Sequence, residues 1–581
     1  MPLLTTEEVT KVLPFLKGKF GEKTANWLLK IIKMDAINQL YDDLVASGLK
    51  NREGLAFLFN QLSVSYLVNK NGLENIPKKG PFVIISNHPF GGIDGMLMAY
   101  VVTGVRQDFK LLANFLLYKI EPLRELFLPV NPFEDRKDLT SSIKGLRGAY
   151  RHINEGHPIG LFPAGAVSTI NFHNFVIEDR LWPHNIRKLL RQLNVPIIPI
   201  HFAGYNSLLF YSLGLINPKL RSIRLPAEVI TKSGKLIRIT IGKAIHPKDF
   251  LSHTLDNFND ILRTKLYSLN YSLWQNIELQ NYNKQVFADD NILEFNQKRL
   301  NELSSHKDNL ISQSGDYLSI LTETNEFQDL NNAEIFDKQK KNITYNKNKN
   351  NELSIENNKC LVTYNVSKNK LEYGFKIFVD DNINNPYFKC GSINNSFKLS
   401  KHFFSHAEDT IIIEEFFHCN EGNNSTELWE SFWNCIFKAL NRFNKKQIII
   451  YTNISLNYSE ELAALISTFL KENFFINSPS MHIKSKNFMK IQFPKRLSKK
   501  AFLNYVNNDF MKLEQFIQDL MPSYKIPPLL IQDLSIMDSK IIGLNIDKKN
   551  SFRIDILTKN NIDNLLERYK KYYNTNLSKN L

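Results

Sequence analysis

With 581 residues, the chain is long enough for two or three domains, and its 43% hydrophobic and 23% charged residues are ordinary for a soluble globular protein. Its net charge of +15 favours an anionic partner (a membrane surface, a nucleic acid or an acidic substrate), although a basic, lysine- and asparagine-rich proteome would explain it equally well. The four cysteines form no C-x-x-C pair, which argues against a zinc site. No secretory signal is evident, and no apolar stretch approaches the roughly 18–20 residues that span a bilayer, so the sequence predicts neither secretion nor a membrane-spanning helix.

The first 75 residues are predicted to be helical. Thr5 and Glu8 have the spacing of a capping box, and residues 26–45 repeat apolar side chains at helical spacing with lysines between them. Such a helix packs on the domain core in one interpretation and lies on an anionic lipid surface in the other. We therefore treat residues 1–75 as a helical segment, with membrane association as the second interpretation.

Residues 76 to about 250 alternate short apolar runs with helical stretches, and further helical sequence continues to about 325. Strands are predicted at 82–87, 159–164, 195–204 and 237–245, and helices at 94–104 and 177–193. This alternation predicts an α/β domain over residues 76–325, with a mixed, partly parallel sheet and flanking helices.

The second half of the chain begins with a polar segment. Residues 326–359 are assigned to a linker, because its asparagine- and lysine-rich part lacks the apolar side chains that a core requires. Apolar runs then return between helical stretches. Residues 360–581 are therefore predicted to form a second, smaller α/β domain.

The segment SNHPFGGIDG, residues 86–95, is the first that suggests chemistry. It follows an apolar strand, and the next helix is predicted to begin near Asp94. A carboxylate at a helix N-terminus is favoured by the helix dipole and can hydrogen-bond an imidazole, and a histidine oriented in this way is a common general base. His88 and Asp94 are therefore candidate catalytic residues, although the segment taken alone is more often a structural polar turn.

Three later segments strengthen this interpretation. NPFEDR contains Phe133 and Arg136, whose guanidinium could bind a phosphate or carboxylate at two points. In LFPAGAVS a strand end is followed by a turn at Pro163 and Gly165, whose backbone N–H groups could face an oxyanion. VPIIPI is a proline-bounded apolar strand.

The order and spacing of these four blocks resemble the glycerolipid (lysophospholipid) acyltransferase family. That family has a His-x-x-x-x-Asp loop after a strand, then a Phe/Arg block, then Phe-Pro-Glu-Gly, then an apolar strand that contains proline, and the resemblance covers residues 76–250. It implies transfer of a fatty acyl group from acyl carrier protein or coenzyme A to a hydroxyl, with no bound cofactor and no metal. It also implies that His88 is the base and Asp94 its orienting acid.

The resemblance further implies a set of substrate-binding residues, in which Arg136 contacts the acceptor head group and Gly165 lies beside the developing oxyanion. The full set is Asn87, Phe133, Arg136, Phe162, Pro163, Gly165 and Ser168. Two features depart from the family pattern: five residues separate His88 from Asp94, and Ala164 stands where the family usually has glutamate. The blocks look more like the acyltransferases that make ornithine or glycine lipids, whose acceptor carries no glycerol phosphate.

Residues 360–581 resemble, more weakly, the N-acyltransferases that begin ornithine-lipid synthesis, which belong to the broad acetyltransferase-like (GNAT) superfamily. The resemblance lies in residues 451–475 and 526–557. The glycine-rich cofactor loop of that family has only a poor counterpart at 418–429. The acidic pair Glu414–Glu415 stands either for the acid of that fold or for solvated residues at a strand end.

We therefore expect an enzyme of lipid biosynthesis that transfers an acyl group to the hydroxyl of a lyso-lipid, either a lyso-amino-acid lipid or lysophosphatidate. The expected partners are a membrane lipid surface and the thioester of acyl carrier protein or coenzyme A, without nucleic acid or metal. We expect a peripheral protein on the cytoplasmic face of the inner membrane. The alternatives are a bifunctional N- and O-acyltransferase and a non-catalytic membrane-binding protein that keeps the fold.

Overall fold

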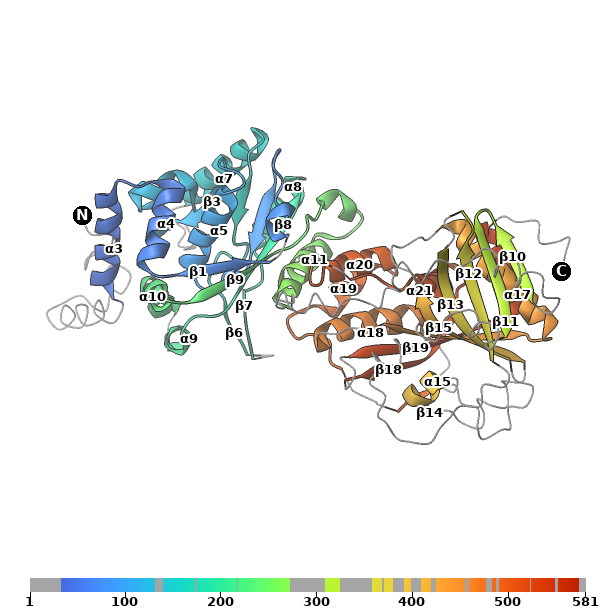
Figure 1. Cartoon of the computed structure of the whole chain (residues 1–581). Coiled ribbons are helices and arrows are strands. Elements are labelled where there is room, and N and C mark those ends of the chain that lie inside the picture. Colours follow the sequence, from blue (N-terminus) through green and yellow to red (C-terminus); the bar gives the residue numbers. More distant parts are fainter. Residues whose placement is uncertain are drawn as a thin grey trace. The chain divides into compact units, whose positions relative to one another are not determined.

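The structure is a computed structural model, and it divides the chain into two compact units (Figure 1). The residues that it describes are 33–69, 71–130, 139–172, 175–216, 218–271, 309–323, 358–367, 370–379, 391–398, 409–418, 425–454, 459–476, 483–486, 491–522, 524–548 and 552–573. The first unit comprises the described residues before Gln275 together with Pro494–Asn507 and Gln515–Pro522, and the second unit comprises the remainder.

A seven-stranded sheet forms the centre of the first unit, in the order β1-β9-β8-β2-β5-β3-β4. The strands are β1 (Ser65–Val68), β2 (Val83–Ser86), β3 (Lys110–Asn114), β4 (Phe127–Val130), β5 (Ile159–Leu161), β8 (Ile197–Ala203) and β9 (Leu236–Ile241). Neighbouring strands are parallel except β8 and β9, which are antiparallel. The predicted α/β domain with a mixed, partly parallel sheet and flanking helices is therefore confirmed.

Helices cover both faces of this sheet. One face carries α4 (Asn51–Gln61) and α5 (Ile93–Thr103), and the other carries α7 (Leu139–Asn154), α8 (His184–Gln192) and α11 (Leu255–Ser268). Successive strand residues point to opposite faces, so Ile84 packs on the α4–α5 side while Val83 and Ile85 pack on the other side. The remaining helices of this unit are α3 (Met34–Ser47), α6 (Phe115–Tyr118), α9 (Leu208–Ile216), α10 (Pro218–Thr231) and α19 (Lys499–Val506).

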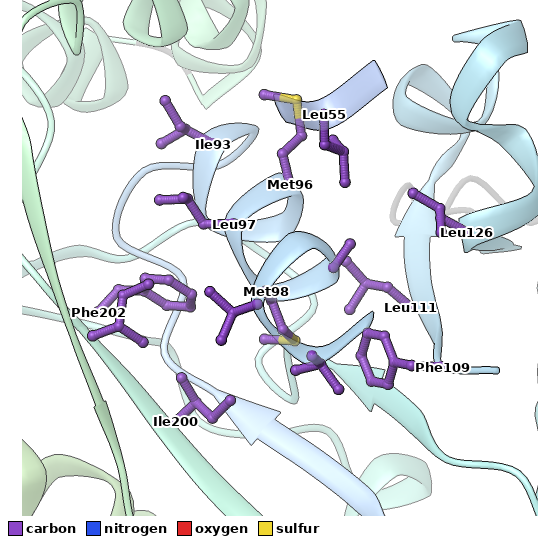
Figure 2. Close-up of a cluster of buried hydrophobic side chains, with 14 of the residues drawn as sticks. Leu55, Ile93, Met96, Leu97, Met98, Phe109, Leu111, Leu126, Ile200 and Phe202 are labelled. Carbon is purple, nitrogen blue, oxygen red and sulfur yellow. The ribbon is translucent and has the colours of Figure 1, made fainter. Parts of the chain in front are cut away.

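Helix α5 is buried inside the core instead of lying on the surface. Ten of its eleven residues are buried, because its sequence is apolar on every side. Figure 2 shows Met96, Leu97 and Met98 of this helix among side chains from the sheet. Each such side chain contributes about 1.5–3 kcal/mol when it is fully buried. The packing of α5 therefore fixes the position of its first turn, which contains Asp94.

The predicted strands in the first domain are confirmed as β2, β5, β8 and β9, and the predicted helix at 94–104 as α5. Three expectations are wrong. Residues 65–68 form β1 beside β9 instead of a helix. Residues 176–178 form β7, which pairs with β6 (Thr169–Asn171), and the helix begins only at His184 after Pro183. Residues 310–323 form two strands of the second sheet.

The predicted domain boundaries differ from the observed units in two places. Residues 310–323 were assigned to the first domain but pair with strands of the second unit. Pro494–Asn507 and Gln515–Pro522 were assigned to the second domain but pack with the first unit. The capping box at Thr5 and the linker up to residue 357 lie outside the described residues.

The second unit is built on an eight-stranded sheet in the order β10-β11-β12-β13-β15-β16-β19-β18. The strands are β10 (Leu310–Ser314), β11 (Tyr317–Glu323), β12 (Asn358–Asn365), β13 (Lys370–Phe378), β15 (Thr410–His418), β16 (Gln447–Ile454), β18 (Lys540–Asp547) and β19 (Arg553–Asn561). Their pairs are antiparallel except β15 and β16, which are parallel and joined by α17 (Thr426–Arg442). The GNAT-like assignment of this unit stays a prediction.

The remaining elements of the second unit pack around this sheet. They are α15 (Gly391–Ser396), β14 (Phe397–Lys398), α18 (Glu460–Phe474), β17 (Lys484–Ser485), α21 (Pro528–Ile531), a π-helix at Gln532–Ile536, α22 (Ile562–Tyr573) and the first half of α20 (Phe510–Gln518). Trp429, Phe432 and Trp433 of α17 are fully buried against it. Among the residues described in either unit, none belongs to a helix with the length and hydropathy needed to span a membrane.

Candidate active site

The loop between β2 and α5 brings the two candidate catalytic residues together. Because α5 begins at Ile93, Asp94 lies in its first turn, while His88 lies in the loop that follows β2. The chain reverses through Gly91, whose φ of +96° is favourable only for glycine. As a result the Nδ1 atom of His88 lies 3.0 Å from Oδ2 of Asp94, even though five residues separate them.

The carboxylate of Asp94 is fully buried and receives four hydrogen bonds. Its Oδ2 accepts from His88 and from the backbone N–H groups of Phe90 (2.9 Å) and Gly91 (3.2 Å), and its Oδ1 accepts from the N–H of Gly95 (2.9 Å). Burial alone would raise the pKa of this carboxyl, but the charge of His88 and these hydrogen bonds outweigh it and lower the pKa below its usual range. Asp94 is therefore an anion that holds one tautomer of the imidazole.

The ring of His88 is largely enclosed, with 14% of its side chain exposed, and it stacks on Phe162 with ring centres 3.9 Å apart. Burial disfavours the imidazolium, but the charges of Asp94 and Asp179 and the hydrogen bond to Asp94 raise the pKa of His88 above its ordinary value. Because Nδ1 is bonded to Asp94, Nε2 is the ring nitrogen that can accept a proton from a bound molecule.

A second acidic residue, Asp179, holds the backbone of His88. The Oδ1 atom of Asp179 accepts from the N–H of His88 (3.2 Å) and from the hydroxyl of Ser168 (2.6 Å). The N–H of Ser168 in turn donates to the carbonyl of His88 (2.9 Å). Burial raises the pKa of Asp179, although these donors oppose the shift. Together, Asp179 and Ser168 bind both backbone polar groups of His88, its N–H and its carbonyl.

Helix α11 fixes Asp179 in turn. The hydroxyl of Tyr267 accepts from the N–H of Asp179 (2.7 Å), and Arg263 donates to the carbonyl of Asp179 (2.6 Å). Sequence reasoning missed Asp179, because it lies 91 positions beyond His88 and no motif links the two residues. Only the position of α11 on the sheet brings Tyr267 and Asp179 together.

An apolar cavity opens beside His88. It is lined from α3 and α4 by Leu40, Leu44 and Leu58, from α5 by Met96, and from α10 by Leu225 and Val229. Among the residues that line it, only His88 and Tyr41 carry polar side chains. Such a lining suits a hydrocarbon chain and places its polar end at His88.

Four further predicted site residues surround the loop. Asn87 binds the backbone of Phe202 through both ends of its amide (2.8 and 2.9 Å), and it thereby fixes the loop to β8. Phe162 stacks on His88, and Ser168 binds the loop backbone as described above. The residue after Phe162, Pro163, is buried at the end of β5. The structure therefore brings these residues together around His88.

Gly165 is exposed and adopts a φ of +64°, and its N–H donates to the carbonyl of Phe162 (3.0 Å), which closes the turn. Ala164, which departs from the family pattern, is only 8% exposed and packs into the core against α7 and α11. Its methyl group therefore lies within the fold. Phe133 and Arg136 fall outside the described residues, so their predicted roles stay predictions.

A buried histidine–carboxylate pair at the end of a parallel strand, facing an apolar cavity, is the arrangement of a general base beside a site for an apolar substrate. The chain belongs to the acyltransferase family: the sequence profile described as Acyltransferase matches residues 9–276. This membership supports an acyltransferase enzyme over the non-catalytic alternative.

Two relatives are named lyso-glycine lipid O-acyltransferase. The protein of Bacteroides thetaiotaomicron is 30% identical over 233 residues, which cover 38% of this chain and 79% of that protein. The protein of Phocaeicola vulgatus is 28% identical over 255 residues, which cover 42% of this chain and 86% of that protein. A crystal structure of the 1-acyl-sn-glycerophosphate (LPA) acyltransferase PlsC from Thermotoga maritima, 16% identical, aligns over 48% of this chain and 100% of that chain with a TM-score of 0.26.

Proposed function

We propose that the first unit transfers a fatty acyl group from a thioester of acyl carrier protein or coenzyme A to the hydroxyl of a lyso-lipid, with a lyso-amino-acid lipid as the preferred acceptor. The observation that carries this proposal is the His88–Asp94 pair at the polar end of an apolar cavity. The names of the two relatives support the choice of acceptor.

In the proposed reaction His88 is the general base. Its Nε2 takes the proton of the acceptor hydroxyl while that oxygen forms an ester bond with the thioester carbonyl carbon. The carbon–sulfur bond then breaks, and the proton passes from His88 to the departing thiolate. Asp94 stabilises the imidazolium that forms in between, because the two atoms are 3.0 Å apart and the carboxylate is buried.

The side chains near the loop support an acceptor without a phosphate. Ala164 supplies no polar group and points into the core, whereas the family usually has glutamate there. The cavity adds only the phenol of Tyr41 to the imidazole of His88. A neutral or zwitterionic amino-acid head group therefore fits the described residues better than glycerol phosphate does. Asn87, Phe162, Pro163, Gly165 and Ser168 shape the proposed site around the bound substrate.

The test is an acyl-transfer assay on the purified full chain with acyl-coenzyme A and acyl carrier protein thioesters. A synthetic lyso-glycine lipid and lysophosphatidate serve as competing acceptors, and mass spectrometry reads the diacylated product. His88→Gln is expected to lower the rate by about 10²–10⁴-fold. The control is His157→Gln, because His157 also pairs with an aspartate (Asp108, 2.6 Å) but at a partly exposed position away from the cavity. A rate for His88→Gln equal to that of the control variant would contradict the proposed base.

We extend the proposal to the location of the enzyme. A lyso-lipid acceptor resides in a bilayer, and the net charge of +15 favours the anionic cytoplasmic leaflet of an inner membrane. A bilayer surface would also keep water from the thioester during transfer. Sedimentation of the chain with vesicles that contain anionic lipid, but not with neutral vesicles, is the expected result.

N-acyl transfer by the second unit is a second candidate function. The observation that favours it is the parallel pair β15 and β16, since ligands of α/β proteins bind at the carboxyl ends of parallel strands. Glu414 is the last residue of β15 that pairs with β16, opposite Tyr451, and half of the poor cofactor-loop candidate at 418–429 lies outside the described residues. Incubation of the chain with an acyl thioester and glycine or ornithine tests this function, and Glu414→Gln is expected to lower any amide formation.

A further inference from the structure

The outer side of α9 and the adjoining β6–β7 hairpin expose large apolar side chains to solvent. Leu208 (80% exposed) and Ile216 (76%) lie at the ends of α9, and Phe175 (82%) lies in the hairpin. We call the exposed residues of these elements, and of the chain just after β7 and just before α9, the apolar patch: Phe172, Phe175, Leu181, Tyr205, Leu208, Leu209, Leu215 and Ile216. The patch holds eight of the 16 large exposed apolar side chains found among the described residues.

These elements are packed against each other and against the candidate active site. Phe210 and Tyr211 on the inner side of α9 are buried against Ile170 and Ile177 of the hairpin. The chain before α9 is fixed as well, since the side chain of Asn206 donates to the carbonyl of Phe90 (3.2 Å) in the loop that carries His88. Figure 1 shows α9, α10 and the hairpin on the side of the sheet away from α7 and α8. The exposed side chains therefore belong to a fixed surface.

The N-terminus of α9 is anchored to α10. The N–H of Ser207 donates to Oε2 of Glu228 (2.9 Å), and its hydroxyl donates to Oε1 (2.6 Å). Glu228 is buried and also receives a hydrogen bond from Arg224. With both its N-terminus and its inner side held by the protein, α9 cannot turn its leucines inward. The apolar patch therefore needs a partner outside this unit.

The chemistry of this surface indicates that the partner is a lipid bilayer, contacted at the interface between its head groups and its hydrocarbon. Residues 202–218 contain no charged side chain. The nine residues of α9 span only about 13 Å at 1.5 Å per residue, far less than the roughly 30 Å of hydrocarbon in a bilayer, so the helix suits a position in the interface and not across it.

The patch is also continuous with the cavity beside His88. Val167 and Leu225 pack with the inner residues of α9 and at the same time line the cavity. We infer that α9 and the β6–β7 hairpin dip into the outer layer of a bilayer, so that an acyl chain or a lyso-lipid passes from the hydrocarbon into the cavity along apolar side chains. This inference rests on the proposed function, since it takes the substrate to be a lipid.

Vesicle flotation of the purified full chain tests the inference. The vesicles contain phosphatidylglycerol and phosphatidylethanolamine, and the patch variant carries Leu208→Gln and Ile216→Gln. Because burial of each leucine or isoleucine contributes roughly tenfold or more to partitioning, the variant is expected to bind about 100-fold more weakly than the unsubstituted chain. The matched control carries Leu251→Gln and Met511→Gln at residues of similar exposure (67% and 72%) outside the patch, and it is expected to bind within about threefold of the unsubstituted chain.

The inference is overturned if the patch variant binds vesicles as tightly as the control. It is also overturned if the unsubstituted chain is a dimer that the patch variant converts to a monomer without any change in vesicle binding, since the patch is then an interface between copies. An acyl-transfer assay separates this inference from the proposed function. The patch variant is expected to lose transfer to a vesicle-borne lyso-lipid but to keep transfer to a short-chain, freely dissolved acceptor. If the unsubstituted chain acylates neither acceptor, the proposed function fails while the flotation result still decides the inference.

Discussion

Substitution of Asp519 by alanine is expected to destabilise the first unit by about 3–5 kcal/mol. Asp519 lies in the segment that returns to this unit from near the end of the chain, and its carboxylate binds the ammonium of Lys265 on α11. The exposed fractions of the two side chains are 1% and 3%. Removing the carboxylate leaves a cation buried beside the rings of Tyr505 and Phe516. It also removes the acceptor for the N–H of Lys243 (3.0 Å).

The pH dependence of this effect has a defined sign. Burial disfavours the ammonium of Lys265, but the charge of Asp519 outweighs burial and raises the pKa of that lysine. A raised lysine pKa contributes stability that is complete at neutral pH and is lost as the pH rises through the folded-state value. The difference between the unsubstituted chain and Asp519→Ala is therefore expected to be largest near pH 7 and to shrink above about pH 10.

Urea unfolding measures the effect, with acyl-transfer activity as the probe of the first unit. Tryptophan fluorescence is recorded in parallel and reports on both units, because Trp182 is buried in the first unit and Trp429 and Trp433 are buried in the second. The double variant Lys265→Met, Asp519→Leu is the control, since replacing a buried ion pair by apolar side chains of similar size is often neutral or stabilising. The reasoning is refuted if Asp519→Ala lies within about 1 kcal/mol of the unsubstituted chain, or if the double variant is no more stable than Asp519→Ala.

Three further predictions concern other carboxylates. In Asp94→Asn, the amide oxygen should take the Oδ2 position, which receives three donors, and should therefore preserve the tautomer of His88. Loss of the negative charge lowers the pKa of His88, so the acid limb of the kcat/KM profile should move to lower pH and kcat should fall about 100-fold. An acid limb that does not move would contradict this prediction. Asp179→Ala should lower kcat/KM about tenfold or more. Asp179→Asn should retain most of the activity, because the amide oxygen can replace Oδ1, which accepts from both the N–H of His88 and the hydroxyl of Ser168. Equal losses in the two variants would contradict the role of Asp179 in positioning His88. Burial raises the pKa of Asp533 from 3.8 to about 6, so the second unit should lose stability as the pH rises from 4 to 6. Asp533→Asn should abolish that loss and stabilise the unit at pH 7 by up to about 3 kcal/mol, as measured by hydrogen exchange of the backbone amides of β16 and β19 in the second sheet.

The central strands of the first sheet could be predicted because each is a short, continuous apolar run. The apolar run of strand β2, with Val83, Ile84 and Ile85 buried, is too short to form a helix but long enough for a strand that is covered on both faces. Strand β1 could not be predicted in this way. Its sequence SYLV is partly exposed at the edge of the sheet, so its conformation depends on pairing with β9. The paired residues Ser65 and Leu236 are 171 positions apart in the sequence.

In the candidate site, too, the residues that are close in sequence could be predicted, and those brought together by long-range packing could not. His88 and Asp94 could be paired from the sequence, because a strand, a glycine turn and a helix start confine the seven residues from His88 to Asp94 to a small volume. Asp179 could not, since its approach to His88 depends on Tyr267 and on the packing of α11. Asp519 is more distant still: it meets Lys265 across 254 positions, through a segment that sequence composition assigns to the other domain.

These long-range contacts bear on how the activity of the first unit should be isolated. Lys265 and Tyr267 lie on the same helix, and Tyr267 accepts the N–H of Asp179, which holds the backbone of His88. Deletion of residues 360–581 would remove Asp519 and the other residues that cover α11. Loss of acyl transfer in such a truncated chain would then follow from a displaced His88 as readily as from a missing second activity. Point substitutions that leave Pro494–Asn507 and Gln515–Pro522 in place separate the two causes, because the first unit keeps its full core while the second unit is altered.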